Sequence, residues 1–373
     1  MKLAVVGGHL TPALALIEYA LAQPQPPQLV FIGRLYSQQR GQQPAHEAAQ
    51  LARLGVPFET FLSPRWYQPN LVEALTWPWL MAVAVIQGWV LMRRHQPDAL
   101  VSFGGYLAAP LALAAWLRGV PIITHEQTSV AGSTNRLVSK LARQVAVAFP
   151  QTAGAFPAGK TTVTGNPIRR EILSPVRAKP DWLPARHKPL VLITGGNQGS
   201  LTLNTVVMRS LPTLTAKFMV VHACGNSTTR SDYRAQLEQA RLKLKPAHRQ
   251  SYVVRPWIEA DELGWLYRRA KAVVTRAGAN TVWELLVAKA PALLVPLPYA
   301  KHDEQLANAK YLVDRKAARL LLQKDLNAES LVTAVQDVAT HHTSIKRYLH
   351  NIDVPTDGSA RLYQVIIESV VSS

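Results

Sequence analysis

The clearest pattern along the chain is a short apolar run, then a glycine-bearing turn, then a stretch with helical spacing. The best example begins with the β-branched run Val273–Thr275 and continues into the loop Arg276–Ala279. Helical spacing extends from Thr281 to about Lys289, and Ala292–Pro296 is apolar again. This order predicts the strand, loop, helix and strand of a parallel βαβ unit. A helix that follows such a loop directs free backbone N–H groups beyond the sheet edge, which suits a phosphate.

The same alternation occurs in both halves of the chain. In the first half, Leu3–Val6 predicts a strand, Gly7–His9 its loop and Thr11–Leu21 a helix. In the second half, Leu190–Thr194 predicts a strand before the run GGNQG, and helical spacing resumes at Leu203. Strands alternating with helices are typical of a doubly wound parallel sheet.

The most apolar stretch extends from Leu71 to Met92. Between Trp77 and Met92 the only clearly polar side chain is that of Gln87. The basic run Arg93-Arg94-His95 follows. A membrane span needs about 20 apolar residues, so this stretch is marginal for one. Two interpretations remain: a helix buried in the core, or a helix that lies against the bilayer surface.

Composition narrows the class of protein. A chain of 373 residues with 48% hydrophobic residues is long enough for two α/β domains. The net charge of +18 fits a nucleic acid, an anionic membrane or a pyrophosphate substrate, but no nucleic-acid module occurs. The single cysteine, Cys224, has no partner for a disulfide or a metal site. Since no secretory signal is recognisable either, we expect residence in the cytoplasm.

One nucleotide-binding pattern is misleading. Gly154–Thr161 satisfies the Walker A pattern, which functions only when a helix follows the loop. The β-branched run Thr161–Thr164 follows instead, so the sequence argues against an ATP-binding P-loop.

Two residues stand out for chemistry. His9 follows a predicted strand, at the edge where open α/β sheets bind ligands, and its ordinary pKa suits a general base. An isolated histidine is more often structural. Glu284 follows the phosphate-type loop, but Thr281 and Glu284 also fit a capping box that would merely begin the helix.

Several motifs resemble, in order and spacing, those of the bacterial MurG family. These are the UDP-N-acetylglucosamine transferases of glycosyltransferase family 28 that make lipid II. The stretch Val273–Ala309 resembles the donor-sugar-nucleotide motif, GGY and HEQ at 104–106 and 125–127 the acceptor-side motifs, and GNP-x-R at 165–169 the interdomain segment. This sequence departs from the family in three places. The first loop is shorter than GGTGGH, Thr128 replaces the asparagine of HEQN, and Asn197 replaces a small hydroxyl residue in GGSQG.

The resemblance implies roles for individual residues. Glu284 would hold the ribose hydroxyls, Gln305 the sugar and Ile258 the uracil, while Arg169 would face the diphosphate or be an exposed hinge residue. His9 is the expected base, and Glu126 is either a second candidate base or the group that orients His9. The implied donor-side residues are Gly7, Gly8, Thr128, Arg169, Asn197, Gln198, Ile258, Gly278, Ala279, Asn280, Thr281, Glu284, Gln305 and Asn308. The implied acceptor-side residues are Gly104, Gly105, Tyr106 and His125.

The resemblance also implies the fold and domain organisation. We expect a GT-B fold with two Rossmann-like parallel-sheet lobes. Residues 1–165 would form the acceptor and membrane-facing lobe and residues 166–355 the UDP-sugar lobe, with a final helix at about 356–373 packing back on the first lobe.

The implied reaction is inverting transfer of N-acetylglucosamine from UDP-N-acetylglucosamine to the muramyl 4-hydroxyl of lipid I, an undecaprenyl-pyrophosphoryl lipid. It would take place at the cytoplasmic face of the plasma membrane, on an anionic surface, with no nucleic-acid partner. No Asp-x-Asp motif occurs, so neither a cofactor nor a bound metal is expected. Three alternatives stay open: transfer to another lipid such as diacylglycerol, a UDP-N-acetylglucosamine epimerase, and a binding protein without catalysis.

Overall fold

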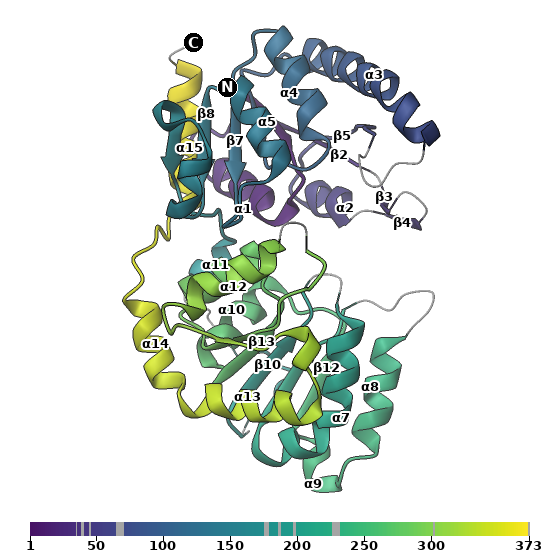
Figure 1. Cartoon of the computed structure of the whole chain (residues 1–373), viewed down its shortest axis with the longest axis vertical. Helices are drawn as coiled ribbons and strands as arrows, with labels where there is room; N and C mark the ends of the chain where they lie inside the picture. The colour runs from purple at the N-terminus through teal and green to yellow at the C-terminus, as the bar shows by residue number, and fades with distance from the viewer. Residues whose placement is uncertain are drawn as a thin grey trace. The chain divides into compact units, whose positions relative to one another are not determined.

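The computed structural model describes residues 1–34, 36–38, 41–44, 46–64, 71–174, 179–185, 188–196, 199–225, 232–300 and 303–371. It divides into two compact units. The first comprises Met1–Arg169 and Pro355–Ser373, and the second Arg170–Val354. Each is a parallel sheet with helices beside it, as labelled in Figure 1.

In the described part of the first unit, seven parallel strands form a sheet of order β5-β2-β1-β6-β7-β8-β9. A separate antiparallel pair is formed by β3 and β4. The elements are β1 Lys2–Val6, α1 Leu10–Leu21, β2 Gln28–Gly33, β3 Tyr36–Gln38, β4 Gly41–Pro44, α2 His46–Arg53, β5 Phe58–Thr60, α3 Leu71–His95, β6 Ala99–Ser102, α4 Ala108–Leu117, β7 Ile122–Glu126, α5 Ser133–Leu141, β8 Gln144–Val147, the 3₁₀ turns η1 Pro150–Ala155 and η2 Ala158–Lys160, β9 Thr161–Val163 and, from the end of the chain, α15 Gly358–Val371.

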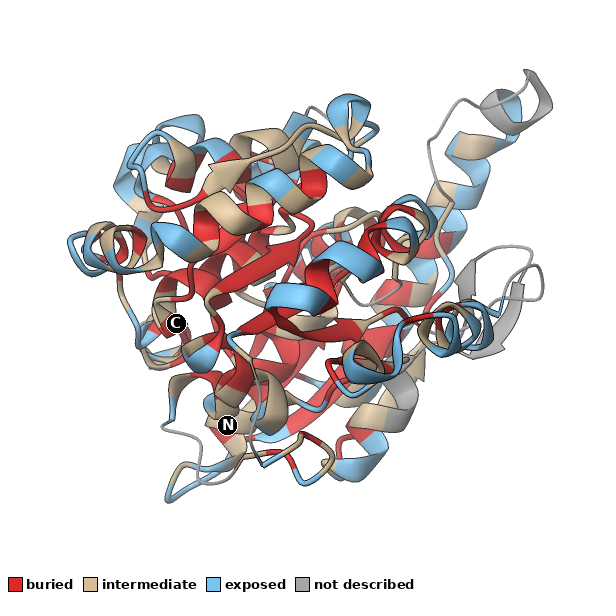
Figure 2. Ribbon diagram, turned by 90° about the horizontal axis from the view of Figure 1, so that it is seen from below, coloured by how far each residue is buried: buried red, intermediate tan, exposed pale blue. Residues whose placement is uncertain are grey.

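The first unit is held together by strands that are apolar on both faces, as expected for a parallel sheet covered by helices. Val5 of β1 pairs with Phe31 on one side and Val101 on the other, and all three are buried. Figure 2 shows the strands as mainly buried and the outer faces of the helices as exposed. The last helix, α15, contributes Leu362 and Ile366 to this core.

The apolar stretch forms one long helix, α3, which contains Pro78 and packs against α4. The packing is close at Gly88, where an added Cβ would lie 3.0 Å from the Cβ of Ala114. By length and composition alone, Leu75–His95 could cross a membrane, and only 22% of its most apolar window is buried. The core-helix interpretation therefore accounts for one face of α3 and leaves the other unexplained.

In the described part of the second unit, six parallel strands form a sheet of order β12-β11-β10-β13-β14-β15. The elements are α6 Arg170–Leu173, β10 Leu190–Thr194, α7 Leu201–Lys217, β11 Met219–Ala223, α8 Tyr233–Leu242, α9 Pro246–Arg249, β12 Tyr252–Arg255, α10 Ala260–Arg269, β13 Ala272–Thr275, α11 Ala279–Ala288, β14 Ala292–Leu294, α12 Glu304–Val313, β15 Arg319–Leu320, the 3₁₀ turn η4 Gln323–Asp325, α13 Ala328–Thr340 and α14 His342–His350.

The structure corrects one helix start that matters for the site. Helix α11 begins at Ala279, with Gly278 as its N-cap, two residues before the predicted start at Thr281. Glu284 therefore lies in the second turn of the helix, too far along it to bond the N-cap N–H. The capping-box interpretation of Thr281 and Glu284 is wrong.

The rejection of the Walker A pattern agrees with the structure. Gly154 and Lys160 lie in the 3₁₀ turns η1 and η2, and the strand β9 follows the lysine where a P-loop needs a helix. The ammonium group of Lys160 donates to the carbonyl oxygen of Ala142 at 2.7 Å.

Candidate active site

In the first unit, the carboxyl ends of β1 and β7 bring His9, His125 and Glu126 close enough to affect one another's charge. His9 is the N-cap of α1 and is half-buried. Burial lowers the pKa of His9 below 6.5, and the Glu126 carboxylate acts in the opposite direction. His9 is therefore a neutral imidazole at neutral pH, which can accept a proton.

His125 is fully buried behind this edge. A ring nitrogen, Nε2, donates to the carbonyl oxygen of Gly165 at 3.1 Å, and the ring lies against Phe103. Burial lowers the pKa of His125 to about 4. Its other nitrogen, Nδ1, is buried and has no hydrogen-bond partner within the part of the chain that the structure describes. The His125 ring is thus held inside the first unit by Gly165 and Phe103, and its acceptor-side role stays a prediction.

Glu126 is buried and uses both carboxylate oxygens to shape the loop between β7 and α5. Oε1 accepts from the Thr128 backbone N–H at 3.0 Å and from the Thr128 hydroxyl at 2.7 Å. Oε2 accepts from the Gly132 N–H at 2.8 Å and from the Asn135 side chain at 3.0 Å. Because these four bonds occupy the oxygens, the geometry argues against Glu126 as the base. Among the described residues no hydrogen bond joins Glu126 to His9, so its predicted role in orienting His9 stays a prediction, and the interaction that the structure supports is through its charge.

Thr128 is also committed to this loop. Its hydroxyl lies 2.5 Å from the carbonyl oxygen of Val130 as well as 2.7 Å from Glu126. The single hydroxyl hydrogen is used within the loop, and the residue is buried. The Thr128 side chain thus supports the loop, and its contact with the donor stays a prediction.

Two glycine-bearing turns of the first unit meet back to back. A Cβ on Gly8 would lie 2.5 Å from the backbone of Gly105, and one on Gly105 would lie 2.5 Å from the Cα of Gly8. Gly105 and Gly104 also have positive φ, and a Cβ on Gly7 would meet Phe31 at 2.6 Å. These glycines permit close packing. The backbone carbonyl of Tyr106, the third predicted residue here, accepts from the Ser63 hydroxyl at 3.3 Å.

In the second unit, the N-terminus of α11 has no side-chain cap. Gly278 is half-buried, and no described atom lies within 4 Å of the place where its Cβ would be. Ala279 is buried, and Asn280 and Thr281 are half-buried in the first turn. The space beside the N-cap of α11 is therefore open at the carboxyl end of β13, and a helix N-terminus suits an anion.

Glu284, one turn further along α11, is buried. The Tyr267 hydroxyl donates to its Oε2 at 3.4 Å, from helix α10. A buried carboxylate needs partners, and this arrangement holds the Glu284 side chain against α10.

The predicted sugar-side residues have different surroundings. Gln305, in the first turn of α12, accepts through Oε1 from the Leu297 N–H at 3.0 Å. Asn308 is buried and donates to the carbonyl oxygen of Ala277 at 3.2 Å, so it supports the loop before α11. Through its bond with the Leu297 N–H, the Gln305 side chain likewise holds the segment after β14.

Ile258 is buried in the connection from β12 to α10, and Arg169 is half-buried at the end of the first part of unit 1. Asn197 and Gln198 lie outside the described residues.

Sequence reasoning missed Arg276. This residue directly follows β13, is 7% exposed and contacts groups beyond three other strands. The available signal was its position: a charged residue immediately after a buried strand lies at the ligand-binding edge.

No cluster of three or more His, Cys, Asp or Glu side chains suited to a metal ion occurs among the residues that the structure describes. Cys224 is buried, and burial raises its pKa to about 11, so its thiol is unreactive at neutral pH.

Comparison with known proteins identifies the family. The model of the glycosyltransferase family 28 N-terminal domain matches residues 6–147, and that of the C-terminal domain matches residues 190–353. Together these matches cover most of the chain. This chain belongs to glycosyltransferase family 28.

Two relatives share the name UDP-N-acetylglucosamine–N-acetylmuramyl-(pentapeptide) pyrophosphoryl-undecaprenol N-acetylglucosamine transferase. The one from Nitratidesulfovibrio vulgaris is 37% identical, over 86% of this chain and 83% of its own length. The one from Anaeromyxobacter dehalogenans is 33% identical, over 89% of this chain and 82% of its own. The resemblance predicted from the motifs is confirmed.

Solved structures also support the membership of the family and the fold. The crystal structure of Acinetobacter baumannii MurG matches with a TM-score of 0.71 and 28% identity, covering 98% of this chain and all of that one. A UDP-GlcNAc 2-epimerase from Neisseria meningitidis has a TM-score of 0.64 but 13% identity, which shows a shared fold alone. The predicted two-lobed GT-B fold is confirmed.

Proposed function

We propose that this family 28 transferase moves N-acetylglucosamine from UDP-N-acetylglucosamine to the muramyl 4-hydroxyl of lipid I, which gives lipid II. The names of its relatives support this substrate pair over diacylglycerol. The observation that carries the donor half is the open N-terminus of α11 at Gly278, with the buried carboxylate of Glu284 one turn behind it.

In the proposed donor site, backbone N–H groups at the start of α11 bind phosphate oxygens of UDP. Hydrogen bonds from backbone N–H groups stabilise negative charge that grows on the leaving diphosphate. Glu284 accepts hydrogen bonds from the two ribose hydroxyls, and the side chain of Gln305 contacts the sugar. The contact of Arg169 with the diphosphate stays a prediction, made because a guanidinium can pair with two phosphate oxygens.

In the proposed chemical step, the muramyl 4-hydroxyl oxygen attacks the anomeric carbon of N-acetylglucosamine. The bond from that carbon to the β-phosphate oxygen breaks, UDP leaves with the electron pair, and the anomeric configuration inverts. The imidazole of His9 takes the hydroxyl proton. The lowered pKa of His9 supports this role, because it keeps the base neutral before the step.

The proposed location is the cytoplasmic face of the membrane, with α3 and α4 against the bilayer. Their large apolar side chains that face solvent are Leu75, Trp79, Leu80, Val83, Ile86 and Val90 on α3, and Leu113, Trp116 and Leu117 on α4. An exposed apolar surface of this kind marks an interaction site. Trp89 lies between Arg93 and Arg118, which supply cationic groups for anionic lipids.

One experiment tests the function directly. The purified protein is incubated with UDP-N-acetylglucosamine labelled in the sugar and with lipid I, and the label is followed into a lipid product. We expect a labelled lipid of the size of lipid II. Label that moves to diacylglycerol, or free N-acetylmannosamine without lipid product, would assign the chain to another activity.

A further inference from the structure

Arg276 is a buried cation at the edge of the second sheet where strands end and helices begin. It follows β13 directly and comes two residues before Gly278, the N-cap of α11. Its side chain is 7% exposed. Such a position is costly for a guanidinium unless its five donors and its charge are both satisfied.

Four of the five donors contact oxygens from three other connections at the same edge. Nη1 donates to the carbonyl oxygens of Val295 and Pro296 after β14, at 3.1 and 3.4 Å. Nη2 donates at 2.7 Å to the hydroxyl of Ser200 before α7 and at 2.7 Å to Oε1 of Gln323 after β15. The acceptors lie in the connections that follow β10, β14 and β15. Together with β13, which Arg276 itself follows, these strands are four neighbours in the sheet, so one side chain links four adjacent connections.

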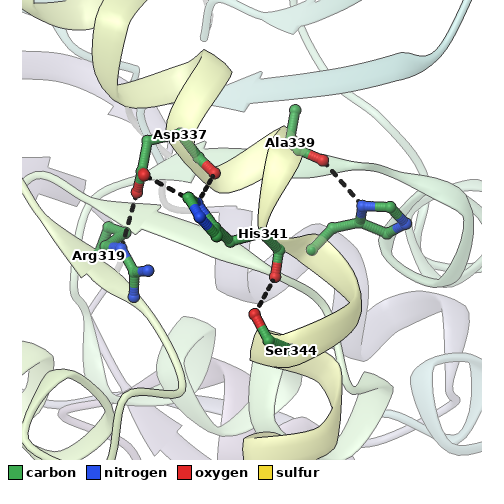
Figure 3. Close-up of polar contacts among 6 residues, drawn as sticks. Arg319, Asp337, Ala339, His341 and Ser344 are labelled. Atoms are coloured by element: carbon green, nitrogen blue, oxygen red, sulfur yellow. Dashed lines mark hydrogen bonds and ion pairs between the residues drawn. The ribbon is translucent and has the colours of Figure 1, made fainter.

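The charge is not satisfied. All four acceptors are neutral, and no carboxylate among the residues described here contacts the Arg276 guanidinium. Burial lowers the pKa of Arg276, and no acid in the described part of the chain acts against this effect. Arg319 shows the ordinary arrangement in the same unit: Figure 3 shows its Nε at the Asp337 carboxylate, 2.8 Å away, with His341 on the other side of Asp337.

The surroundings add positive potential and supply none of the missing negative charge. Ser200 is the N-cap of α7, and its oxygen accepts from the Leu203 N–H at 3.4 Å as well as from Arg276. The amino ends of α7 and α11 carry positive partial charge from their helix dipoles. A guanidinium and two helix N-termini at one sheet edge therefore make a strongly anion-attracting place.

We propose that Arg276 is a positioning residue of the donor site, whose buried charge is compensated by the diphosphate of the nucleotide sugar. The inference rests on the proposed function, because it takes UDP as the ligand. Arg276 acts in two ways. It fixes Ser200, Gln323 and the end of β14 relative to one another, and its charge strengthens binding of the phosphates without contact.

The first test compares ligands with and without phosphate. Binding of UDP and of uridine is measured by calorimetry for the wild type, Arg276→Gln and the control Arg319→Gln, which loses the same charge at the Asp337 pair. Through partly screened interaction with a diphosphate, the Arg276 charge should be worth on the order of tenfold in UDP affinity. We expect Arg276→Gln to lose about that factor for UDP and less than about twofold for uridine. Arg319→Gln should bind both as the wild type does.

The second test keeps Arg276 and adds the missing charge. Gln323→Glu replaces the amide that contacts Nη2 with a carboxylate of the same shape. The carboxylate should raise the melting temperature of the ligand-free protein, because it pairs the buried guanidinium. It should also weaken UDP binding by about tenfold and leave uridine binding unchanged, because it competes with the diphosphate for the same charge. This variant decides the question if Arg276→Gln fails to fold.

The outcomes separate the two proposals. Equal loss of UDP and uridine affinity in Arg276→Gln, or unchanged UDP affinity in Gln323→Glu, would overturn the compensation of the Arg276 charge by the diphosphate while the wild type still binds UDP. A wild-type protein that binds neither UDP nor UDP-N-acetylglucosamine would overturn the proposed function itself.

Discussion

At the scale of single residues, His9 and Glu284 carry the chemistry that we propose, and each is controlled by one neighbouring residue. Glu126 raises the pKa of His9 against the effect of burial, and Tyr267 donates to the carboxylate of Glu284. These neighbours make the roles testable, because each variant predicts a change in one property and not in another.

Replacing His9 with alanine should lower kcat by about 10²–10⁴-fold, the usual contribution of a general base. The wild-type rate should fall as the pH drops through the His9 pKa, which lies below 6.5, because the protonated ring cannot accept a proton. That acid limb should be absent in the variant. Rates measured across pH check this, with the exposed His350→Ala as the control. A variant with normal kcat and the same acid limb would remove His9 from the mechanism.

Replacing Glu284 with alanine should weaken UDP binding by about ten- to a hundredfold, since hydrogen bonds to a charged group contribute roughly 1.5–3 kcal/mol. The ribose hydroxyls would lose their acceptor. Titration calorimetry with UDP measures the loss, and Glu329→Ala, an exposed glutamate in the first turn of α13, is the control. Unchanged UDP affinity in Glu284→Ala would assign this carboxylate to contacts within the second unit, such as the one with Tyr267.

At the scale of elements, the connection from β7 to α5 shows a charged residue that organises a loop. Glu126 is the last residue of β7, and its four accepted hydrogen bonds fix the residues up to Asn135 in α5. The loop therefore depends on an acceptor-only group at this position.

Replacing Glu126 with glutamine should have two effects. The amide NH₂ would face N–H donors of the loop, so the melting temperature should fall, with a loss of about 1.5–3 kcal/mol in unfolding free energy. The acid limb of the pH–rate profile should also move to lower pH, because the carboxylate that raises the His9 pKa is gone. Thermal unfolding and the pH profile measure these effects. If Glu126 were the base, the variant would instead have a lower kcat at every pH, and its pH–rate profile would have no acid limb.

At the scale of the whole molecule, charge and apolar surface act together. The net charge is +18, and α3 and α4 expose large apolar side chains beside Arg93 and Arg118. An apolar surface with cations beside it suits an anionic bilayer.

The double replacement of Trp79 and Ile86 with serine should reduce binding to vesicles that contain anionic lipid. Their exposed fractions are 73% and 63%, so folding should not suffer. Binding of the wild type should also weaken as salt rises, because ions screen the basic groups. Vesicle sedimentation measures both effects, and Tyr299→Ser, at an 88% exposed position of the second unit, is the control. Full vesicle binding by the double variant would exclude this surface.

The sequence by itself determined the strand and helix order, because buried parallel strands must be apolar runs and each turn must fit a short connection. It also placed His9, Glu126 and Gly278 at strand ends, since all strands of a parallel sheet point the same way. Its motifs were sufficient to indicate the family. Each of these features is written in residues that are neighbours along the chain.

Only the tertiary structure decided what the charged side chains contact. It began α11 at Ala279, which excluded a capping box for Glu284, and it turned Glu126 and Thr128 into the loop. It also joined Arg276 to Ser200 and Gln323, which are 76 and 47 residues away in sequence. Local patterns reflect propensity and burial, whereas these hydrogen bonds depend on which strand ends become neighbours when the sheet forms. No periodicity in the chain encodes that choice.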